Sequence, residues 1–508
     1  MGIKNKYLQI CAVIFVLFPA AGRVYGAMTM APYLQGVETN SIYVMVECDQ
    51  SAPAAEVEYG PDTSYGYTGA FESAPATGAS PARYVHTVRL STGLSANNTY
   101  HYRVRQNGSA WSADYTFKTS VLPGTAFRFA YIADSQSSLQ TSPAASRTVL
   151  NQITALMQAA NPRFSIYGGD ISDQGNAAVY HADLFLPSQL GYIGNVPFFD
   201  SVGNHEQYTT ASQAFLQEPY STANHPNPWY SFDYGDMHVL VLYTDTDGNA
   251  ANCAVGSAQY NFAMADLAAT TKPWKIVVAH APAWTCAYFN NNHGAECANM
   301  KTMTANIFEP YGVSFVIGGH YHYYQHNIVN GIHHMTISSA GADLETPGNY
   351  TSPAYTVLSK KTNCYAVADV DANNFCLKTY DQAGALVENI CLVKNTPTNT
   401  PTWDPSLPSY TSTPITTPTS TRTPPALPGP ILDDFTDGDF TDNLWNGNWI
   451  YWGATNCQAV ADYPVGYGPY AGRIYGDVTG DGWPGLTGKA ELNAAGVAQD
   501  LSEIGRAH

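Results

Sequence analysis

Apolar and polar residues alternate with a period of two through short runs between residues 31 and 120. Examples are residues 41–46 (SIYVMV), 99–104 (TYHYRV) and 115–119 (YTFKT), with Gly, Asn, Ser and Pro between them. Alternation that is rich in β-branched and aromatic side chains predicts half-buried strands, and a series of such strands joined by turns is typical of a β-sandwich. We therefore predict an all-β sandwich over residues 28–122.

The pattern changes over residues 124–394. Short apolar runs there end in polar motifs and alternate with stretches of helical spacing, of which residues 144–160 are the clearest, with apolar side chains at Val149, Ile153 and Met157. Repetition of strand, helix and strand predicts an α/β domain with a largely buried sheet. Ligands of such domains bind beyond the carboxyl ends of the strands, which is where the polar motifs lie.

The N-terminal residues 1–27 have the pattern of an export signal. Lys4 and Lys6 precede an apolar stretch over residues 8–21, and small residues such as Ala27 close the segment. This stretch is shorter than the roughly 20 apolar residues that a membrane span needs. We therefore expect cleavage, a secreted or extracytoplasmic protein and no membrane span in the mature chain.

Two further segments follow the α/β domain. Residues 395–430 are dense in Thr, Pro and Ser, which predicts an extended linker. Residues 431–508 are rich in glycine and aromatic residues, and we predict a β-rich segment that resembles a carbohydrate-binding domain and contacts glycans or a cell surface. Core aromatics explain the same tryptophans equally well. The segment is short for such a fold, so we expect a truncated C-terminus.

Charge restricts the substrate. Lys and Arg total 22 against 40 Asp and Glu, a formal net charge of -18. Such a field repels nucleic acid and anionic membranes, so neither is an expected partner. It also repels small phosphate anions, unless metal ions make the site locally positive.

The cysteines leave the disulfide pattern open. Of 9 cysteines, Cys11 lies in the predicted signal, and the remaining eight show no paired C-x-x-C spacing. An even number in an exported chain indicates disulfides, whose pairing the sequence does not determine.

Five motifs follow apolar strands in the predicted α/β domain: ADSQ (133–136), GDISD (169–173), GNHE (203–206), VVAH (277–280) and GHYH (319–322). A lone Asp after a strand, such as Asp134 or Asp170, is equally typical of a helix cap, and His280 alone fits a buried histidine. His320 and His322 differ, because a strand runs into two glycines and then presents two imidazoles two positions apart. Such a pair can serve two adjacent ions. Oxygen and imidazole ligands suit zinc, iron or manganese.

In their order, the five motifs resemble those of the calcineurin-like metallophosphoesterases, whose pattern is D-x-H or D-x-G, then GD, GNH-D/E, a lone H and GH-x-H. The resemblance covers residues 124–394. The N-terminal sandwich resembles a fibronectin type III module and opens with Pro32-Tyr-Leu-Gln35, which points to the purple acid phosphatase-like branch. Together they imply an α/β/β/α metallophosphoesterase sandwich behind an all-β sandwich, with two divalent or trivalent ions of Fe, Zn or Mn.

The resemblance also implies ligands for each ion. The first ion would be held by Asp134, Asp170 and His322, with Gln136 as a possible fourth ligand. The second ion would share Asp170 and would be held further by Asn204, His280 and His320. The implied reaction is direct in-line attack of water on phosphorus, without a covalent enzyme intermediate.

Two histidines are implied in proton transfer. His205, beside Asn204, is the candidate proton donor to the leaving oxygen. His293, in the segment 290–294 (NNNHG), is a candidate phosphate contact or second acid. We assign no catalytic role to His333 and His334, which we expect in a strand near the site.

The sequence departs from the purple enzymes in three places. Asp173 stands where they carry a tyrosine ligand, so we expect no purple colour, and Asp173 is either a residue that orients a ligand or a loop residue. Gln136 stands where they carry glycine and many other members histidine, and an amide oxygen is a weaker ligand. Gln325 and His326 replace the Glu-Arg pair that follows GH-x-H.

Three functions fit these residues. Hydrolysis of a phosphomonoester, as in an acid phosphatase, leads. Phosphodiester or nucleotide hydrolysis uses the same metal pair, and pocket loops that the sequence does not resolve select between them. The alternative from another class is a catalytically impaired cell-surface binding protein, which the intact ligand set disfavours. A sandwich adhesin whose motifs are coincidental would bind no transition metal.

Overall fold

The computed structural model describes residues 27–52, 54–76, 79–106, 108–137, 143–207, 227–244, 253–285, 294–347 and 355–394, together with four short strands beyond residue 476. The chain divides into two compact units, Met1–Asn399 and Thr400–His508. The predicted linker and the predicted signal, except for Ala27, lie outside the described residues. Among the helices that are described, none is long and apolar enough to span a membrane.

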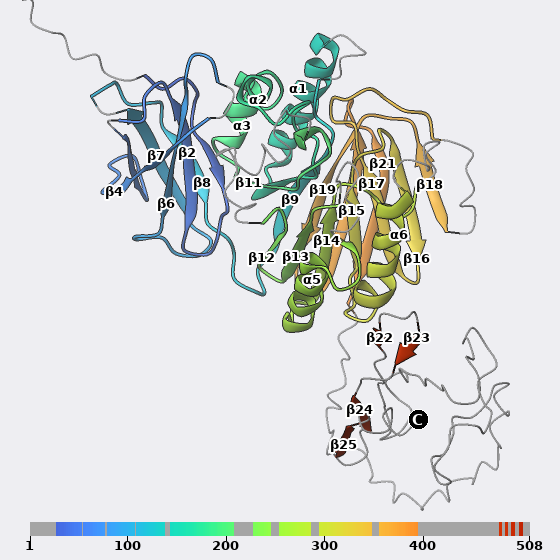
Figure 1. The fold of residues 1–508 in the computed structure, drawn as a ribbon. Helices are drawn as coiled ribbons and strands as arrows, with labels where there is room; N and C mark the ends of the chain where they lie inside the picture. Colours follow the sequence, from blue (N-terminus) through green and yellow to red (C-terminus); the bar gives the residue numbers. More distant parts are fainter. Residues whose placement is uncertain are drawn as a thin grey trace, which may run out of the picture. The chain divides into compact units, whose positions relative to one another are not determined.

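Three sheets build the first unit (Figure 1). The strands of the largest are β1 (Tyr33–Gln35), β2 (Ile42–Cys48), β5 (Glu72–Pro75), β6 (Tyr84–Leu90), β9 (Phe127–Ile132), β10 (Phe164–Tyr167), β11 (Phe198–Asp200), β19 (Cys364–Val370), β20 (Asn374–Asp381) and β21 (Leu386–Val393). They form a 10-stranded sheet in the order β21-β20-β19-β9-β10-β11-β1-β2-β6-β5. Strands β9, β10 and β11 are parallel to one another.

The second sheet faces the middle of the first. Its strands are β12 (Tyr230–Tyr234), β13 (Met237–Leu242), β14 (Trp274–Ala279), β15 (Phe315–Gly318), β16 (Tyr324–Val329), β17 (Ile332–Ile337) and β18 (Thr356–Lys360). They form a 7-stranded sheet in the order β12-β13-β14-β15-β17-β16-β18, in which β13, β14, β15 and β17 run parallel. The third sheet has 4 strands in the order β4-β3-β7-β8, with bounds Tyr67–Ala70, Ala55–Gly60, Thr99–Gln106 and Tyr115–Lys118.

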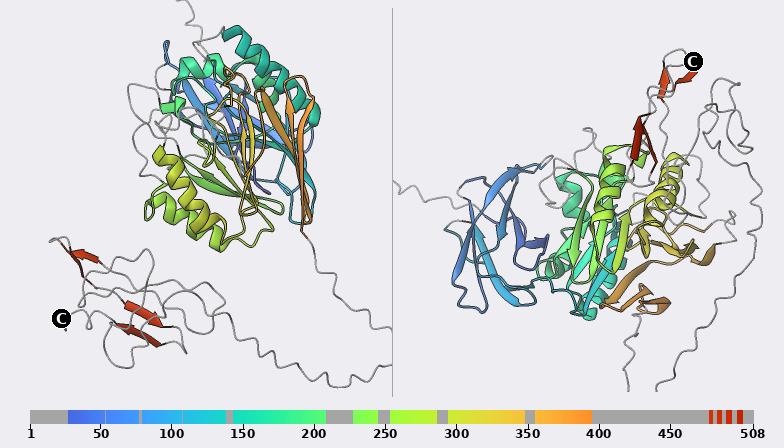
Figure 2. Two further views of the ribbon diagram at one scale, coloured as in Figure 1. Left: turned by 90° about the vertical axis from the view of Figure 1, so that its right-hand side faces the viewer. Right: turned by 90° about the horizontal axis from the view of Figure 1, so that it is seen from below.

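Helices cover the outer faces of the two large sheets (Figure 2). They are α1 (Pro143–Ala160), α2 (Ala177–Asp183), α3 (Pro187–Ile193), α5 (Ala258–Ala269) and α6 (Gly294–Met303), with a 3-10 helix at His205–Gln207 and a π-helix at Thr304–Phe308. In β9, Phe129 packs between the sheets while Ile132 packs toward α1, as period-two alternation requires. The arrangement confirms the predicted α/β/β/α fold behind an all-β domain, and α1 confirms the helix predicted over residues 144–160.

The N-terminal strands are continuous with the α/β domain, which the sequence did not indicate. Strand β1 pairs antiparallel with β2 and parallel with β11, where Gln35 is opposite Phe198. Tyr102 donates a hydrogen bond to the carbonyl of Gly194 at 2.6 Å, which further joins the two parts. The predicted sandwich is therefore not a free-standing module, since one of its sheets extends through the α/β domain.

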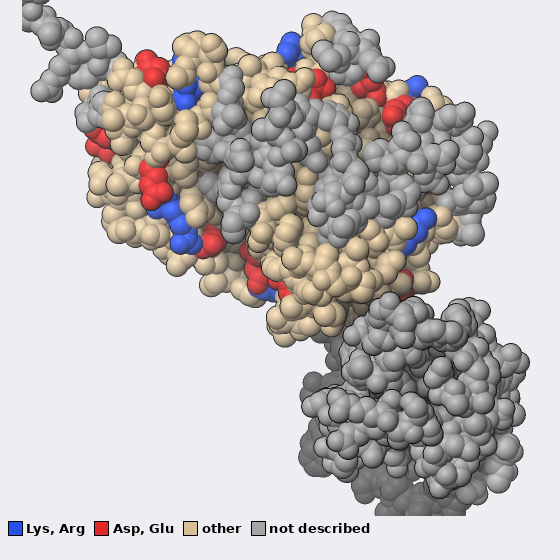
Figure 3. All heavy atoms as spheres, in the orientation of Figure 1, with Lys and Arg blue, Asp and Glu red and all other residues tan. Residues whose placement is uncertain are grey.

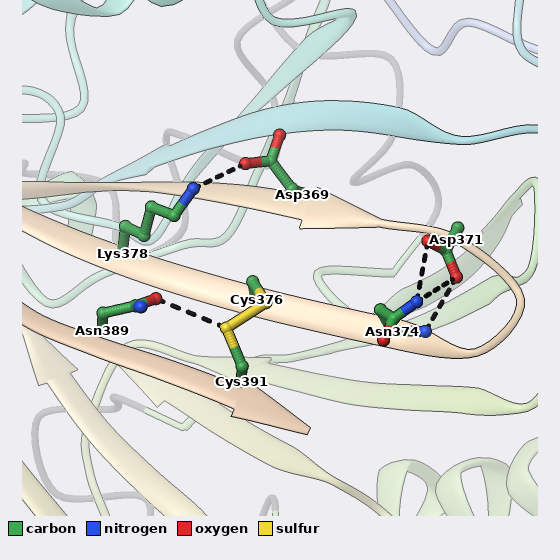
Figure 4. The surroundings of a disulfide bond; sticks show 7 residues. All are labelled: Asp369, Asp371, Asn374, Cys376, Lys378, Asn389 and Cys391. Carbon is green, nitrogen blue, oxygen red and sulfur yellow. Dashed lines mark hydrogen bonds and ion pairs between the residues drawn. A yellow bond between two sulfur atoms is a disulfide. The ribbon is translucent and has the colours of Figure 1, made fainter. Parts of the chain in front are cut away.

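One disulfide lies in the described residues, between Cys376 of β20 and Cys391 of β21, which are direct partners in the sheet (Figure 4). Cys48 and Cys364 are buried free thiols, and Cys253 is buried as well. The register of β20 and β21 thus supplies one of the pairings that the spacing of the cysteines left open.

The C-terminal unit is described only in four strands. These are β22 (Asp477–Thr479), β23 (Trp483–Gly485), β24 (Lys489–Leu492) and β25 (Val497–Asp500). They pair antiparallel as β22 with β23 and β24 with β25. The predicted glycan contact falls on a segment whose side chains lie outside the description.

An ion triple that joins β12, β13 and α5 around the buried His238 makes stability depend on pH. His238 contacts Asp233 at 2.8 Å and Asp266 at 2.7 Å. Burial lowers the pKa of His238, but the two carboxylates outweigh it and raise that pKa to about 9. The pKa of His238 in the folded protein lies above its value of about 6.5 in the unfolded chain, so the triple stabilises the fold fully below about pH 6.5. This contribution disappears as the pH rises through about 9.

We therefore expect His238→Gln to lower the free energy of unfolding by about 2 kcal/mol at pH 6. The difference from the wild type should shrink progressively toward about pH 10. Urea unfolding of both proteins across this range measures it. A difference that stays constant with pH would show that packing, rather than charge, is what His238 contributes.

Candidate active site

The motif residues follow strands of both large sheets and meet at one place. Asp134, Asp170 and Asn204 follow β9, β10 and β11, whereas His280 and the pair His320 and His322 follow β14 and β15. The Nε2 atom of His280 lies 3.2 Å from Oδ2 of Asp170, which joins the two sheets directly. The carboxyl ends of parallel strands from both sheets therefore build one polar cluster.

One group within this cluster has the spacing of a metal site. The ligand atoms of Asp170, His280 and His320 all lie within 4.8 Å of one another. Oδ1 of Asn204 is 3.0 Å from Nδ1 of His320. Two ligands of a single ion lie about this far apart when each bond is about 2 Å long. These four residues are the set that the motifs assigned to the second ion.

The other predicted group lies beside it. Nε2 of His322 is 3.5 Å from Oδ1 of Asp134, and Nε2 of His280 is 3.9 Å from the same oxygen. Nε2 of Gln136 donates to Oδ2 of Asp170 at 3.5 Å. Oε1 of Gln136 is buried and has no hydrogen-bond partner among the residues that the structure describes. A buried amide oxygen of this kind is suited to complete an ion's ligand shell.

Hydrogen bonds to carbonyl groups set the tautomers of two histidines. Nδ1 of His280 contacts the carbonyl of Gly168 at 2.8 Å, and Nδ1 of His322 contacts that of Asp343 at 2.7 Å. A carbonyl only accepts, so each Nδ1 carries hydrogen, and each Nε2 is left to bind a cation. The donor set therefore fits the ions that the motifs imply.

The electrostatics of the cluster also favour cations. Burial lowers the pKa of His322, but Asp134 outweighs it and raises that pKa to about 9. Burial raises the pKa of Asp170, but His280 and His205 outweigh it and hold that pKa below its ordinary value. Carboxylates that attract a proton to His322 attract a metal ion to the same place.

Three of the candidate ligands have unusual backbone conformations. The φ angles of Asp134, Asp170 and His320 are 54°, 50° and 70°. This left-handed region costs a residue with a side chain about 1 kcal/mol or more, so it persists only where the surroundings impose it. Its recurrence at three ligands is evidence for a functional site that does not depend on any family pattern.

Glycines precede the ligands because the loops approach one another too closely for side chains. A Cβ on Gly203 would collide with Oδ1 of Asp170, and a Cβ on Gly319 would collide with Oδ2 of Asp134. The GN and GH motifs therefore contain glycine so that each loop can pass directly against a carboxylate carried by another.

His205 lies at the edge of the cluster, with an Asp behind it. Nδ1 of His205 is 3.1 Å from Oδ1 of Asp173, and Nε2 is 3.8 Å from Oδ2 of Asp170. Nε2 therefore faces the cluster, and about a quarter of the side chain is exposed. The position of Asp173, which the sequence left undecided, is that of a group that orients His205.

The remaining predicted residues separate into two groups. His293 lies outside the described residues. His333 and His334 lie on β17, as expected, and His326 contacts His333 at 2.9 Å and Glu388 at 3.0 Å instead of the ligand cluster.

Sequence reasoning missed two buried residues that touch the ligands. Ser338 donates to Oδ2 of Asp134 at 2.5 Å, and Glu206 accepts from the backbone N–H of Asp170 at 3.0 Å. Glu206 was visible as the last residue of GNHE, whereas no pattern marks Ser338.

Two segments of the chain match known protein families. Residues 127–324 match the calcineurin-like phosphoesterases, and residues 31–119 match the purple acid phosphatase N-terminal domain. The chain carries a calcineurin-like phosphoesterase domain. A purple acid phosphatase N-terminal domain precedes it. Both matches confirm the resemblance drawn from the motifs.

Individual relatives are distant. The chain is 28% identical to the probable inactive purple acid phosphatase 1 of Arabidopsis thaliana over 275 residues, which are 48% of this chain and 43% of the relative. It is 30% identical to acid phosphatase A of Cryphonectria parasitica over 164 residues, which are 29% of this chain and 30% of the relative. The chain thus spans less than half of each. The structure of the purple acid phosphatase PPD1 from yellow lupin has a TM-score of 0.60 at 19% identity, over 71% of this chain and 74% of that one, and shares the fold.

Proposed function

We propose that this chain is an exported hydrolase of phosphate esters that uses two metal ions. The observation that carries the proposal is the convergence of oxygen and imidazole ligands from two facing sheets, with Nε2 of His280 3.2 Å from Oδ2 of Asp170. Asp134, Asp170 and His322, with Gln136, would hold one ion. Asp170, Asn204, His280 and His320 would hold the other. Iron, zinc and manganese all suit these ligands.

When bound, such ions offset charge on the phosphoryl oxygens and lower the pKa of water. The remaining steps fall to the protein. His205, oriented by Asp173 at its Nδ1, would donate a proton from Nε2 to the leaving oxygen. The anchored rings of His280 and His322 would keep their Nε2 atoms directed at the site, so that little reorganisation accompanies the reaction.

A phosphomonoester is the proposed substrate. The acid phosphatase among the relatives supports this class, while the same arrangement of ligands serves diesters as well. On the described part of the face in Figure 3, charged side chains are scattered among uncharged ones, which favours a small ester over a polynucleotide. With Asp173 in place of a tyrosine, the loaded protein should be colourless.

Export is proposed on two observations. The first is the signal-like pattern of residues 1–27. The second is the disulfide between Cys376 and Cys391, because such bonds persist mainly in oxidising compartments.

The function is tested by metal analysis and turnover of the purified chain. We expect about two transition-metal ions per chain and hydrolysis of p-nitrophenyl phosphate in preference to bis-p-nitrophenyl phosphate. His320→Ala should remove turnover. The matched control is His101→Ala, because His101 lies in β7 of the N-terminal strands and pairs with Asp114. Metal-free protein that stays inactive after addition of zinc, manganese or iron would contradict the proposal.

A further inference from the structure

Glu206 is a fully buried carboxylate that lies directly behind the ligand loops. It belongs to the 3-10 helix at His205–Gln207, next in sequence to the candidate proton donor, and its exposed fraction is 0%. Glu206 is not a candidate metal ligand, because its carboxylate oxygens accept hydrogen bonds from backbone amides.

Four backbone N–H groups converge on this carboxylate. Oε2 accepts from Gly203 at 2.7 Å and from Asp170 at 3.0 Å, and Oε1 accepts from Ile171 at 2.7 Å and from Ser172 at 3.2 Å. Buried amides need acceptors, and bonds to an ionised acceptor are the stronger kind. Burial and the neighbouring charge of Asp170 raise the pKa of Glu206 to about 8, and the N–H donors on both oxygens limit this rise.

The four donors come from two different ligand loops. Asp170, Ile171 and Ser172 belong to the GD loop, and Gly203 belongs to the GN loop that carries Asn204. A reciprocal bond runs from the backbone N–H of His205 to Oδ1 of Asp170 at 2.9 Å. Each loop thus presents a carboxylate to the backbone of the other. This exchange holds Asp170 in its left-handed conformation, with φ at 50°.

We propose that Glu206 is a positioning residue for the metal centre, which fixes the separation of Asp170 and Asn204 and thereby sets ion affinity. This inference rests on the proposed function, since it concerns the same pair of ions. Glu206 touches neither ion nor substrate. Its loss should therefore weaken metal binding while leaving the groups that act on the ester in place.

The test is Mn²⁺ binding to the metal-free full chain, measured by isothermal titration calorimetry. Glu206→Gln keeps the size of the side chain but turns an N–H group toward backbone donors. We expect its Mn²⁺ dissociation constant to rise by about 10- to 100-fold, the range seen when groups behind metal ligands are removed. At saturating Mn²⁺, kcat should recover to near the wild-type value.

Controls separate positioning from general loss of stability. Asp236→Asn is matched, because Asp236 is also buried and accepts a backbone N–H, from Gly124 at 2.8 Å, yet belongs to no ligand loop. It should lower the melting temperature without changing Mn²⁺ affinity. Glu206→Asp keeps the charge and should bind Mn²⁺ with intermediate affinity, and it decides the question if Glu206→Gln does not fold.

Equal Mn²⁺ affinity in the wild type and in a folded Glu206 variant would overturn this inference and leave the proposed function intact. A wild-type chain that binds no Mn²⁺, Zn²⁺ or iron would overturn both.

Discussion

Replacing Asp170 by asparagine should lower kcat/KM for a phosphate ester by at least roughly a thousandfold, or about 4 kcal/mol of transition-state stabilisation. Asp170 is the residue that both predicted ligand sets share, and its carboxylate lies between His280 and His205. Asparagine keeps the shape of the side chain and an oxygen for the N–H of His205. It removes the negative charge that would join two cations. Steady-state turnover of p-nitrophenyl phosphate and elemental analysis measure the two consequences.

Elemental analysis should show that Asp170→Asn retains fewer than two ions per chain. Asp236→Asn again provides the control, because it makes the same change of a buried Asp outside the ligand cluster. A protein with Asp170→Asn that keeps wild-type metal content and turnover within about tenfold would remove Asp170 from the centre of the site.

Convergence of the motifs was predictable from sequence because it follows from topology. Asp134 and Asp170 each end a parallel strand, and neighbouring parallel strands present their carboxyl ends together. Local periodicity was enough to place these strands, and helical spacing was enough to place α1. The contact between the sheets, from His280 to Asp170, joins residues that are distant in sequence. The family resemblance assigned both residues to one ion, whereas no local pattern brings them together.

The junction of the N-terminal strands with the α/β domain was not predictable, because it depends on a strand too short to show a period. Strand β1 has 3 residues, and its partner across the junction, at Phe198, is far away in sequence. The left-handed backbone conformation of Asp134 and His320 could not be predicted from the sequence for a related reason. Local propensity opposes that conformation, and only contacts made by the folded chain impose it.

The residues that contact the candidate ligands and His205 could not be predicted from the sequence either. Asp173 follows Asp170 in the same loop, yet its proximity to His205 depends on how two loops pack. Ser338 reaches Asp134 from the end of another strand, β17. Side-chain contacts of this kind depend on distances of a few ångströms between loops, which residue types do not encode.

Replacing His205 by asparagine should produce a loss of activity that depends on the leaving group. A proton donor contributes most when the departing oxygen is strongly basic, and its usual contribution is about 10²- to 10⁴-fold. We therefore expect kcat to fall by about a thousandfold with an alkyl phosphate and by only about tenfold with p-nitrophenyl phosphate, whose leaving group departs without a proton.

Asp173→Asn is the matched variant for His205, because it leaves the imidazole in place and removes the charge 3.1 Å from its Nδ1. Without that charge the imidazole is less firmly oriented toward the site, so kcat for the alkyl phosphate should fall by about tenfold. Metal content should match the wild type in both variants, since neither residue is a predicted ligand. An equal loss with both esters would instead assign His205 to binding the phosphoryl group, because an interaction with that group does not depend on which alcohol leaves.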